Sequence, residues 1–359
     1  MNISVIILTY NESIHIRRCI DNVLPVAYEV FVVDCFSTDK TVEIAESLGA
    51  DVVQNIWEGQ YSRQFNWALE NLPIKTSWVL RLDADEYLCP ELIEEIKVKL
   101  ETLPEDVTGV AFHLRRVFMG RVIRHGVPRI KMIRLFRYGK ARCEQRLMDE
   151  HIELLEGRAV EFEGEFADHN LHDIGWWTAK HNGYALREAV DLLDLEYKLF
   201  DHEKHETPRN RGVDLSRKDV ETQRDVEEDV TTEGTEEEVA VSGGSRQRES
   251  QSAVAVGSQQ WARNGRRGTG LEAQAAEKRR KKMRYAKMPL FWRAFVYFGW
   301  RYFLRGGFLE GKEGFLWHFL QGWWYRTLVD AKVWEIKRES GGDREKMLAL
   351  LRGKYGMKV

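Results

Sequence analysis

The chain has 359 residues, of which 43% are apolar and 31% are charged, and its formal net charge is −3. This length allows one large domain or two ordinary ones, and the near balance of charge excludes nucleic-acid binding driven by overall positive charge. Four widely separated cysteines form no CxxC pair, which excludes a cysteine zinc site of the usual spacing and is typical of buried thiols in a reducing compartment.

The first hundred residues alternate short β-branched runs with helical patterns. Strands are predicted at 3–8, 28–33, 50–54 and 78–82, and helices at 15–24, 40–48, 62–72 and 90–100. Four such alternations predict an α/β fold with a mostly parallel sheet that helices cover on both faces. Ligands of such sheets bind at the carboxyl ends of the strands, so the turns at 9–12, 34–39 and 83–86 are the candidate site.

The rest of the chain divides into three parts. Extended segments are expected at 109–117, 130–136 and 160–166, followed by a long helix from 175 to about 200. Residues 219–238 then hold ten acidic residues and one arginine, and 242–270 are rich in Gly, Ser, Gln and Arg, without apolar periodicity. The predicted organisation is a catalytic domain at 1–205, a disordered insert at 206–274 and a helical region at 275–359.

The helical region combines a basic run at 278–284 with aromatic segments at 290–304 and 315–334, which contain six of the twelve tryptophans. On a helix drawn from residue 289, Arg293, Arg301 and Arg305 fall on one side and interrupt the ~20 apolar residues that a spanning helix needs. An amphipathic helix in the membrane interface tolerates such arginines and favours Trp and Tyr at its rim. The alternative is an aromatic subdomain packed against the catalytic domain.

We expect a cytoplasmic protein that lies peripherally on the inner face of a membrane. The first residues have no basic region or apolar core of a signal peptide, and the basic run is suited to anionic lipid head groups.

An acidic cluster, Asp83-Ala84-Asp85-Glu86, follows the fourth predicted strand. Carboxylates grouped at a strand end are unfavourable unless a cation binds there, and Mg²⁺ commonly takes one or two carboxylates together with substrate phosphates. At the end of the second strand, Asp34 can accept hydrogen bonds from a nucleotide base or ribose. Asp39 is interpreted equally well as a ligand contact or as a helix N-cap.

Together these segments resemble the inverting glycosyltransferases of family 2, which have the GT-A fold. The resemblance rests on Val5-Ile6-Ile7-Leu8-Thr9-Tyr10-Asn11-Glu12, on Val32-Val33-Asp34 with Ser37-Thr38-Asp39, and on Leu82-Asp83-Ala84-Asp85-Glu86, in that order. Glu150-His151 and the aromatic C-terminal region are similar to the branch that builds lipopolysaccharide core and related surface glycans.

The resemblance implies a role for each matching residue. Those expected to contact the donor are Thr9, Glu12, Asp34, Asp39, Arg63, Asn66 and Asp83. Asp85 would coordinate Mg²⁺ or Mn²⁺, and His169, with His172 close by, would supply a third metal ligand or contact the pyrophosphate unless these histidines are structural. The base that takes the acceptor proton would be Glu150, with Asp149 in reserve, and a plain surface turn is the alternative for this stretch.

The expected function is transfer of a sugar from a nucleotide-diphosphate sugar to a membrane-associated glycan or lipid-linked acceptor, in cell-surface glycan or lipopolysaccharide biosynthesis. A nucleotidyltransferase is one alternative, but it should carry a Gly- and Arg-rich loop where this chain has Thr9-Tyr10-Asn11-Glu12. The other alternative is a non-catalytic, membrane-bound scaffold that binds nucleotide sugars. No nucleic-acid partner is expected.

Overall fold

The computed structural model describes residues 2–144, 151–200, 285 and 287–357. The predicted insert at 206–274 and the basic run at 278–284 lie outside the described residues. Those described between 1 and 200 and between 288 and 359 belong to one compact unit.

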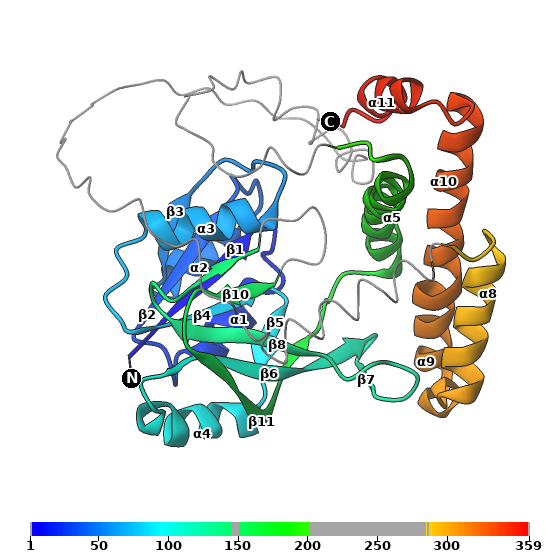
Figure 1. The fold of residues 1–359 in the computed structure, drawn as a ribbon. Helices are drawn as coiled ribbons and strands as arrows, with labels where there is room; N and C mark the ends of the chain where they lie inside the picture. The colour runs from blue at the N-terminus through cyan, green and yellow to red at the C-terminus, as the bar shows by residue number, and fades with distance from the viewer. Residues whose placement is uncertain (1, 145–150, 201–284, 286, 358–359) are drawn as a thin grey trace, which may run out of the picture. The chain divides into compact units, whose positions relative to one another are not determined.

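Residues 3–83 form the parallel part of a nine-stranded sheet (Figure 1). Its strands β1 (Ile3–Thr9), β2 (Glu29–Asp34), β3 (Asp51–Gln54) and β4 (Trp78–Asp83) lie in the order β3-β2-β1-β4, and all three pairings are parallel. The helices α1 (Ile16–Val23), α2 (Thr41–Ser47) and α3 (Tyr61–Asn71) connect them. The predicted strands and helices are therefore confirmed, with ends that differ by only a few residues.

Strand β1 shows why these strands are apolar throughout and not alternately polar. Val5 and Ile7 pack into one apolar core with residues of α1 and α2, whereas Ile6 and Leu8 pack into a second core with residues of α3. Because both faces of the strand are buried, the positions from Val5 to Leu8 are all apolar, which is the pattern of a parallel sheet with helices on both sides.

The second half of the sheet is mixed. It contains β5 (Glu86–Leu88), β6 (Val107–Phe118), β7 (Arg121–Ile123), β8 (Lys131–Arg137) and β11 (Arg158–Asp168), and the sheet order continues β4-β8-β6-β11-β5. The helix α4 (Pro90–Lys99) and a 3₁₀ turn at Leu100–Thr102 precede β6, and β9 (Ala141–Cys143) pairs with β10 (Ile152–Leu154) in a separate ribbon. The predicted extended segments are confirmed as β6, β8 and β11.

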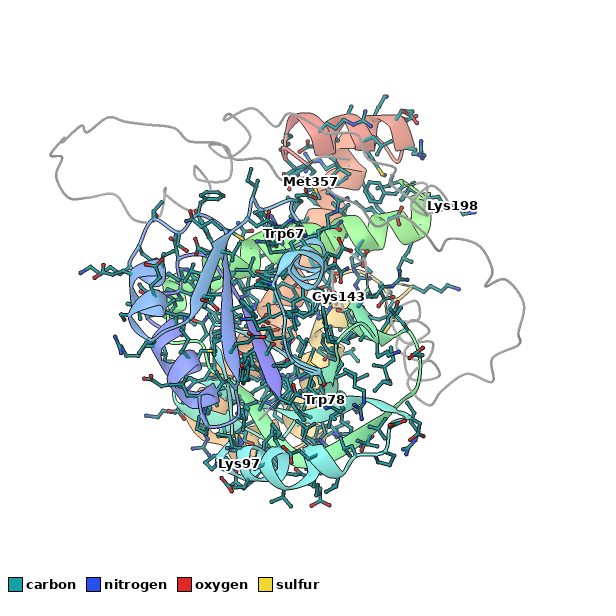
Figure 2. All side chains as sticks on the ribbon, turned by 90° about the vertical axis from the view of Figure 1, so that its left-hand side faces the viewer. Trp67, Trp78, Lys97, Cys143, Lys198 and Met357 are labelled. Carbon is teal, nitrogen blue, oxygen red and sulfur yellow. The ribbon has the colours of Figure 1, made fainter. Side chains whose placement is uncertain are left out.

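Side chains cover both faces of the sheet (Figure 2). Trp78, labelled there at the start of β4, has the Arg137 guanidinium 4.7 Å from its ring centroid. Such a stack covers the edge of the core with the apolar part of a charged side chain.

Helices make up the remainder. The helix α5 (Ile174–Tyr197) is capped by the Asp173 carboxylate, which accepts a hydrogen bond of 2.8 Å from the Trp176 amide. After residue 288 come α8 (Trp292–Gly299), a π-helical turn η3 (Trp300–Leu304), a 3₁₀ turn η4 (Gly307–Glu310), α9 (Gly311–Trp317), a second π-helical segment η5 (His318–Trp324), α10 (Tyr325–Ser340) and α11 (Arg344–Gly353). Within the described ranges, none of these helices has both the length and the apolar character to cross a bilayer.

Two sets of contacts attach the C-terminal helices to the catalytic domain. The first joins α10 to α5, where Tyr325 donates a 2.7 Å hydrogen bond to Glu188 and Arg326 pairs with the same carboxylate. The second holds the loop between β7 and β8. The buried Glu310 accepts hydrogen bonds from the backbone amides of Arg124 and His125, at 2.7 and 2.6 Å.

The same loop is fixed from two further directions. Arg301 donates to the Gly126 carbonyl at 3.0 Å, and Nε2 of the buried His318 lies 3.1 Å from the His125 carbonyl. Gly126 has φ +71°, and a Cβ added there would lie 2.5 Å from His318 Cε1. The fit therefore requires glycine, both for its backbone conformation and for the space. On the side that holds this loop, the C-terminal helices therefore pack against the first 200 residues, as the alternative of a packed aromatic subdomain predicts.

Candidate active site

The turns after β1 and β2 are locked to each other by hydrogen bonds. Buried Asp34 accepts hydrogen bonds from the Thr9 hydroxyl at 3.1 Å and from the Ser37 amide and hydroxyl at 2.8 and 2.5 Å. Asn11 has φ +52°. Its backbone N–H donates to the Ser37 hydroxyl at 2.8 Å, and its side-chain Oδ1 accepts from the Thr38 backbone N–H at 2.9 Å. Thr9 and Asp34, both predicted donor contacts, therefore lie together and order the carboxyl ends of β1 and β2.

Asp39 lies at the start of α2. Its carboxylate accepts hydrogen bonds from the Thr41 amide at 2.9 Å and from the Ser13 amide at 3.1 Å. Partial burial tends to raise the pKa of Asp39, but these hydrogen bonds outweigh it and the pKa is lowered. The N-cap residue of α2 is Lys40, so Asp39 lies one residue before the cap, although it still accepts from the first amide of the helix. Its exposed side chain leaves the ligand interpretation open.

The two residues predicted on α3 have different environments. Arg63 is exposed and lies 3.4 Å from Glu58. The Asn66 amide makes a pair of hydrogen bonds with the Cys143 backbone, at 2.9 and 2.8 Å, so both of its polar atoms hold β9 against α3. Both hydrogen bonds of Asn66 stabilise the fold. Asn66 could contact the donor substrate only if one of these two hydrogen bonds were broken.

The acidic cluster at the end of β4 lies over two buried arginines. Arg134 pairs with Glu86, and Nη2 atoms of Arg134 and Arg81 lie 3.7 and 3.8 Å from Asp83. Burial tends to raise the pKa of Asp83, but the two guanidinium groups outweigh it and the pKa is lowered. Burial raises the pKa of Glu86 despite its contact with Arg134, so the two guanidinium groups act mainly on Asp83.

Asp85 is positioned by residues from α1 and from the segment after β11. Its carboxylate accepts a 3.1 Å hydrogen bond from Asn170, and its backbone carbonyl accepts from Arg18 at 3.0 Å and from the His169 amide at 3.1 Å. The register of β5 and β11 sets Glu86 opposite Asp168. Burial, reinforced by the negative charge of Asp85, raises the pKa of Asp168 to about 7.

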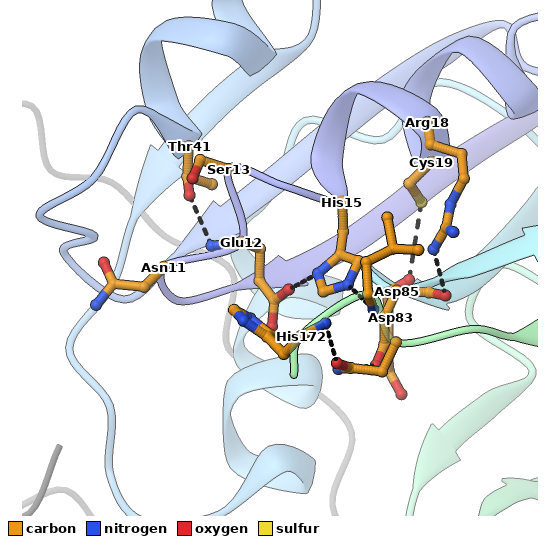
Figure 3. Close-up of polar contacts among 12 residues, drawn as sticks. Asn11, Glu12, Ser13, His15, Arg18, Cys19, Thr41, Asp83, Asp85 and His172 are labelled. Carbon is orange, nitrogen blue, oxygen red and sulfur yellow. Dashed lines mark hydrogen bonds and ion pairs between the residues drawn. The ribbon is translucent and has the colours of Figure 1, made fainter. Parts of the chain in front are cut away.

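A cluster of Glu12, His15 and His172 lies beside Asp83 and Asp85 (Figure 3). One ligand-type atom from each of the three lies within 4.8 Å of the other two. His15 Nε2 accepts from the Leu171 amide at 2.8 Å, so Nδ1 carries the proton and donates to Glu12 at 2.5 Å. Both nitrogens of His15 are therefore committed, and this residue orients Glu12.

His172 differs from His15 and from His169. Its ring stacks on Trp176 at 3.9 Å, burial lowers its pKa, and its buried Nε2 has no hydrogen-bond partner among the described residues. In contrast, His169 Nδ1 lies 3.3 Å from an Arg18 guanidinium, which can only donate. His172 thus has an uncommitted buried nitrogen, which the sequence-based choice of His169 did not anticipate.

The residues found here fit a divalent cation. Oδ1 of Asp83 is another buried atom without a hydrogen-bond partner among the described residues, and it lies 3.8 Å from Nη2 of Arg81. Carboxylate oxygens and a neutral imidazole nitrogen are suitable ligand types for Mg²⁺ or Mn²⁺.

A cavity of about 510 Å³ extends from this cluster to the C-terminal helices. Asp85, Asp168 and His172 line one end, and Trp317 and Gln321 line the other. The candidate bases Asp149 and Glu150 lie outside the described residues.

Lys180 on α5 also lines the cavity, and sequence reasoning did not select it. Its ammonium group lies 4.4 Å from the centroid of the Trp176 ring. Burial tends to lower the pKa of Lys180, but Tyr184 and the carboxylates of Asp85 and Glu12 outweigh it and the pKa is raised. In the sequence, Lys180 is distinguished only by lying four residues after Trp176 on a predicted helix. This spacing places the two side chains on one face of the helix but does not indicate a function.

Comparison with known proteins identifies the family. The profile described as Glycosyl transferase family 2 matches residues 4–151. An uncharacterized glycosyltransferase of Rickettsia conorii, RC0292, is 35% identical over 208 residues, covering 55% of this chain and 72% of that protein. Another, from Rickettsia bellii, is 44% identical over 119 residues, which is 33% of this chain and 39% of the relative.

Solved structures show more distant similarity. S. aureus TarS 1–349 in complex with UDP is 27% identical with a TM-score of 0.30, over 36% of this chain and 38% of that one. Glucosyl-3-phosphoglycerate synthase of Mycobacterium tuberculosis, solved with Mn²⁺, UDP and glucosyl-3-phosphoglycerate, is 25% identical with a TM-score of 0.26, over 33% and 44%. On the sequence matches and the sheet described above, this chain belongs to glycosyl transferase family 2, has the GT-A fold and is a glycosyltransferase.

Proposed function

We propose that the chain is an inverting glycosyltransferase that moves a sugar from a nucleotide-diphosphate sugar to a membrane-associated glycan or lipid-linked acceptor, in cell-surface glycan or lipopolysaccharide biosynthesis. The observation that carries the proposal is the cavity of about 510 Å³ that joins Asp85 to the C-terminal helices. One end has the charges a diphosphate needs, and the other end belongs to the aromatic region expected at a membrane.

The donor nucleotide is assigned to the carboxyl ends of β1 and β2, near Thr9, Glu12, Asp34 and Asp39. The hydrogen bonds that lock these turns support this assignment, because they hold the polar groups in place before the ligand binds.

The diphosphate is assigned to the space between Asp85 and Lys180. A divalent cation held by Asp85, with Asp83 and His172 as further ligands, would neutralise the diphosphate as it leaves. In addition to the cation, the Lys180 ammonium group supplies a positive charge from the protein.

The chemical step is a displacement with inversion. The acceptor hydroxyl oxygen forms a bond to the anomeric carbon, the bond from that carbon to the diphosphate oxygen breaks, and the hydroxyl proton passes to a carboxylate. We assign this base role to Glu150, with Asp149 in reserve. Asp168, whose side chain lines the cavity, is the third candidate.

The test is a panel of nucleotide sugars incubated with the full chain and a membrane extract, with products identified by mass spectrometry. Sugar-dependent release of nucleoside diphosphate is expected, and Asp85→Asn or a chelator should remove most of it. Asp51→Asn, the same change at an exposed position of β3, is the control. Binding without transfer across the panel would indicate a scaffold, and pyrophosphate release from nucleoside triphosphate would indicate a nucleotidyltransferase.

A further inference from the structure

The C-terminal helices expose an unusual concentration of large apolar side chains. Residues 287–316 contain twelve of them, as many as all the described residues between 2 and 200. We call this set the aromatic face. Its members are Met288, Phe291, Trp292, Phe295, Val296, Trp300, Phe303, Leu304, Phe308, Leu309, Phe315 and Leu316.

Ring contacts connect the aromatic face through Trp323, the buried Phe298 and Tyr302. Ring-to-ring contacts with centroids 5.4 to 6.3 Å apart run from Trp292 to Phe295, Trp323, Phe298 and Tyr302. From Tyr302 a further contact of 5.7 Å reaches Phe315 on α9. Isolated exposed apolar residues are common on soluble proteins, but a connected patch of this kind marks an interaction surface.

Two arginines of these helices point inward. Arg293 is 2% exposed and pairs with the buried Asp330, and Arg301 is 6% exposed and donates to the Gly126 carbonyl. By contrast, Leu304 is 79% exposed and Trp292 is 68% exposed. A water-facing helix has the opposite arrangement, so the outer side of this segment is adapted to an apolar environment.

The charges around the aromatic face have one sign. Arg305 and Lys312 are exposed within residues 288–316, whereas the two acidic residues there, Glu310 and Glu313, are buried and partly buried. The absence of an exposed carboxylate in this stretch matches an anionic partner. A two-fold pairing of two such faces would instead bring like charges together.

We propose that the aromatic face inserts into the interface of a lipid bilayer that contains anionic lipids, with Arg305 and Lys312 close to the head groups. Trp and Tyr side chains are favoured at that depth, and a helix lying in the interface needs no spanning length. The face thus holds the enzyme on the membrane by insertion from one side.

The helix that leaves the aromatic face also reaches the cavity. Leu316 belongs to the face, while Trp317 and Gln321, which follow directly, line the cavity. An acceptor whose lipid tail stays in the bilayer can therefore present its head group towards Asp85 along α9 and η5. This second step rests on the proposed function, whereas insertion of the face does not.

Vesicle flotation of the full chain tests the insertion. The protein should float with vesicles of phosphatidylcholine and phosphatidylglycerol, and less with phosphatidylcholine alone. The variant Phe303→Ser/Leu304→Ser should bind at least tenfold more weakly, whereas Val98→Ser on α4, 70% exposed in the wild type, should bind normally. Arg305→Gln/Lys312→Gln should lose the preference for the anionic lipid.

Three results would overturn the proposal. The first is unchanged flotation of Phe303→Ser/Leu304→Ser, and the second is no binding of the wild type to anionic vesicles. The third is a lipid-free dimer that the same variant converts to a monomer, because the face would then be a contact between copies. An unchanged melting temperature of the variant, measured alongside, establishes that it is folded.

A second measurement separates this inference from the proposed function. Release of nucleoside diphosphate should fall for Phe303→Ser/Leu304→Ser on intact membranes and recover on a detergent-dispersed extract. Flotation without any sugar transfer by the wild type would refute the proposed function and leave the insertion standing. Transfer by a wild type that does not float would refute the insertion alone.

Discussion

Acidification should weaken the attachment of the C-terminal helices, because two histidines there are held neutral. Burial, reinforced by the positive charge of Arg301, lowers the pKa of His318 to about 4. Burial also lowers the pKa of His181 to about 4, and its Nε2 lies 2.7 Å from the Gln321 amide nitrogen, an arrangement in which that ring nitrogen accepts. Both residues join elements of the catalytic domain to the segment η5.

The sign follows from comparing the folded and unfolded chains. An unfolded histidine has a pKa near ~6.5, so below that pH the proton binds the unfolded chain more tightly. The stabilisation is therefore complete above about pH 6.5 and is lost as the pH falls towards 4. Glu310, which also faces His318, has a lowered pKa, so it stays ionised through most of this range.

Between pH 7 and pH 5 a histidine with these two pKa values lowers the free energy of unfolding by about 2 kcal/mol. His318 is fully buried and should show most of this effect, whereas His181 is partly exposed and should show less.

Urea denaturation followed by tryptophan fluorescence at the two pH values gives the measurement. Each protein is compared with itself, so the offset that His318→Gln causes at pH 7 cancels. The variant should lose about 2 kcal/mol less than the wild type between pH 7 and pH 5. Equal losses in the two proteins would refute the reasoning.

Three further outcomes are expected. Glu150→Gln should lower the turnover rate by roughly 10²–10⁴-fold with donor affinity retained, and Asp149→Asn should do far less; the reverse pattern in single-turnover assays would exchange their roles. Lys180→Met should lower the turnover rate by about 10²-fold if its ammonium faces the diphosphate, with partial rescue by Lys180→Arg; a normal rate would place the diphosphate elsewhere. Gly126→Ala should lower the melting temperature and increase proteolysis of the C-terminal helices, since the added Cβ would lie 2.5 Å from His318, whereas Gly139→Ala, also at positive φ but with open space, should affect stability less.

Much of the parallel half of the fold was predictable because its signal is local. The run Ile3–Thr9 is apolar at nearly every position since both faces of β1 are buried, and a polar turn follows it. The mixed half was not predictable in its pairing. Glu86 and Asp168 are opposite each other only because β11 lies between β6 and the edge strand β5, and no local pattern records that partner.

The site divides in the same way. The sequence predicted the acidic cluster, because carboxylates at a buried strand end are conspicuous. It did not predict that Arg81 and Arg134 would lie beneath the cluster. The sequence around an arginine inside an apolar strand does not show which carboxylate it will pair with. The choice between His169 and His172 depended on Arg18, whose guanidinium lies at one ring and not at the other.

The loop between β7 and β8 is recognised chiefly through its main chain. Glu310 binds the amides of Arg124 and His125, and Arg301 binds the Gly126 carbonyl. Two side chains add to this: the His125 ring contacts Glu310 at 2.7 Å, and the buried Val127 shares an apolar cluster with Leu320. Evolution can therefore vary the side chain at position 124 freely while the two parts of the enzyme stay joined. Glycine at 126, by contrast, should persist among homologues that keep these C-terminal helices, and its replacement would accompany their loss or redesign.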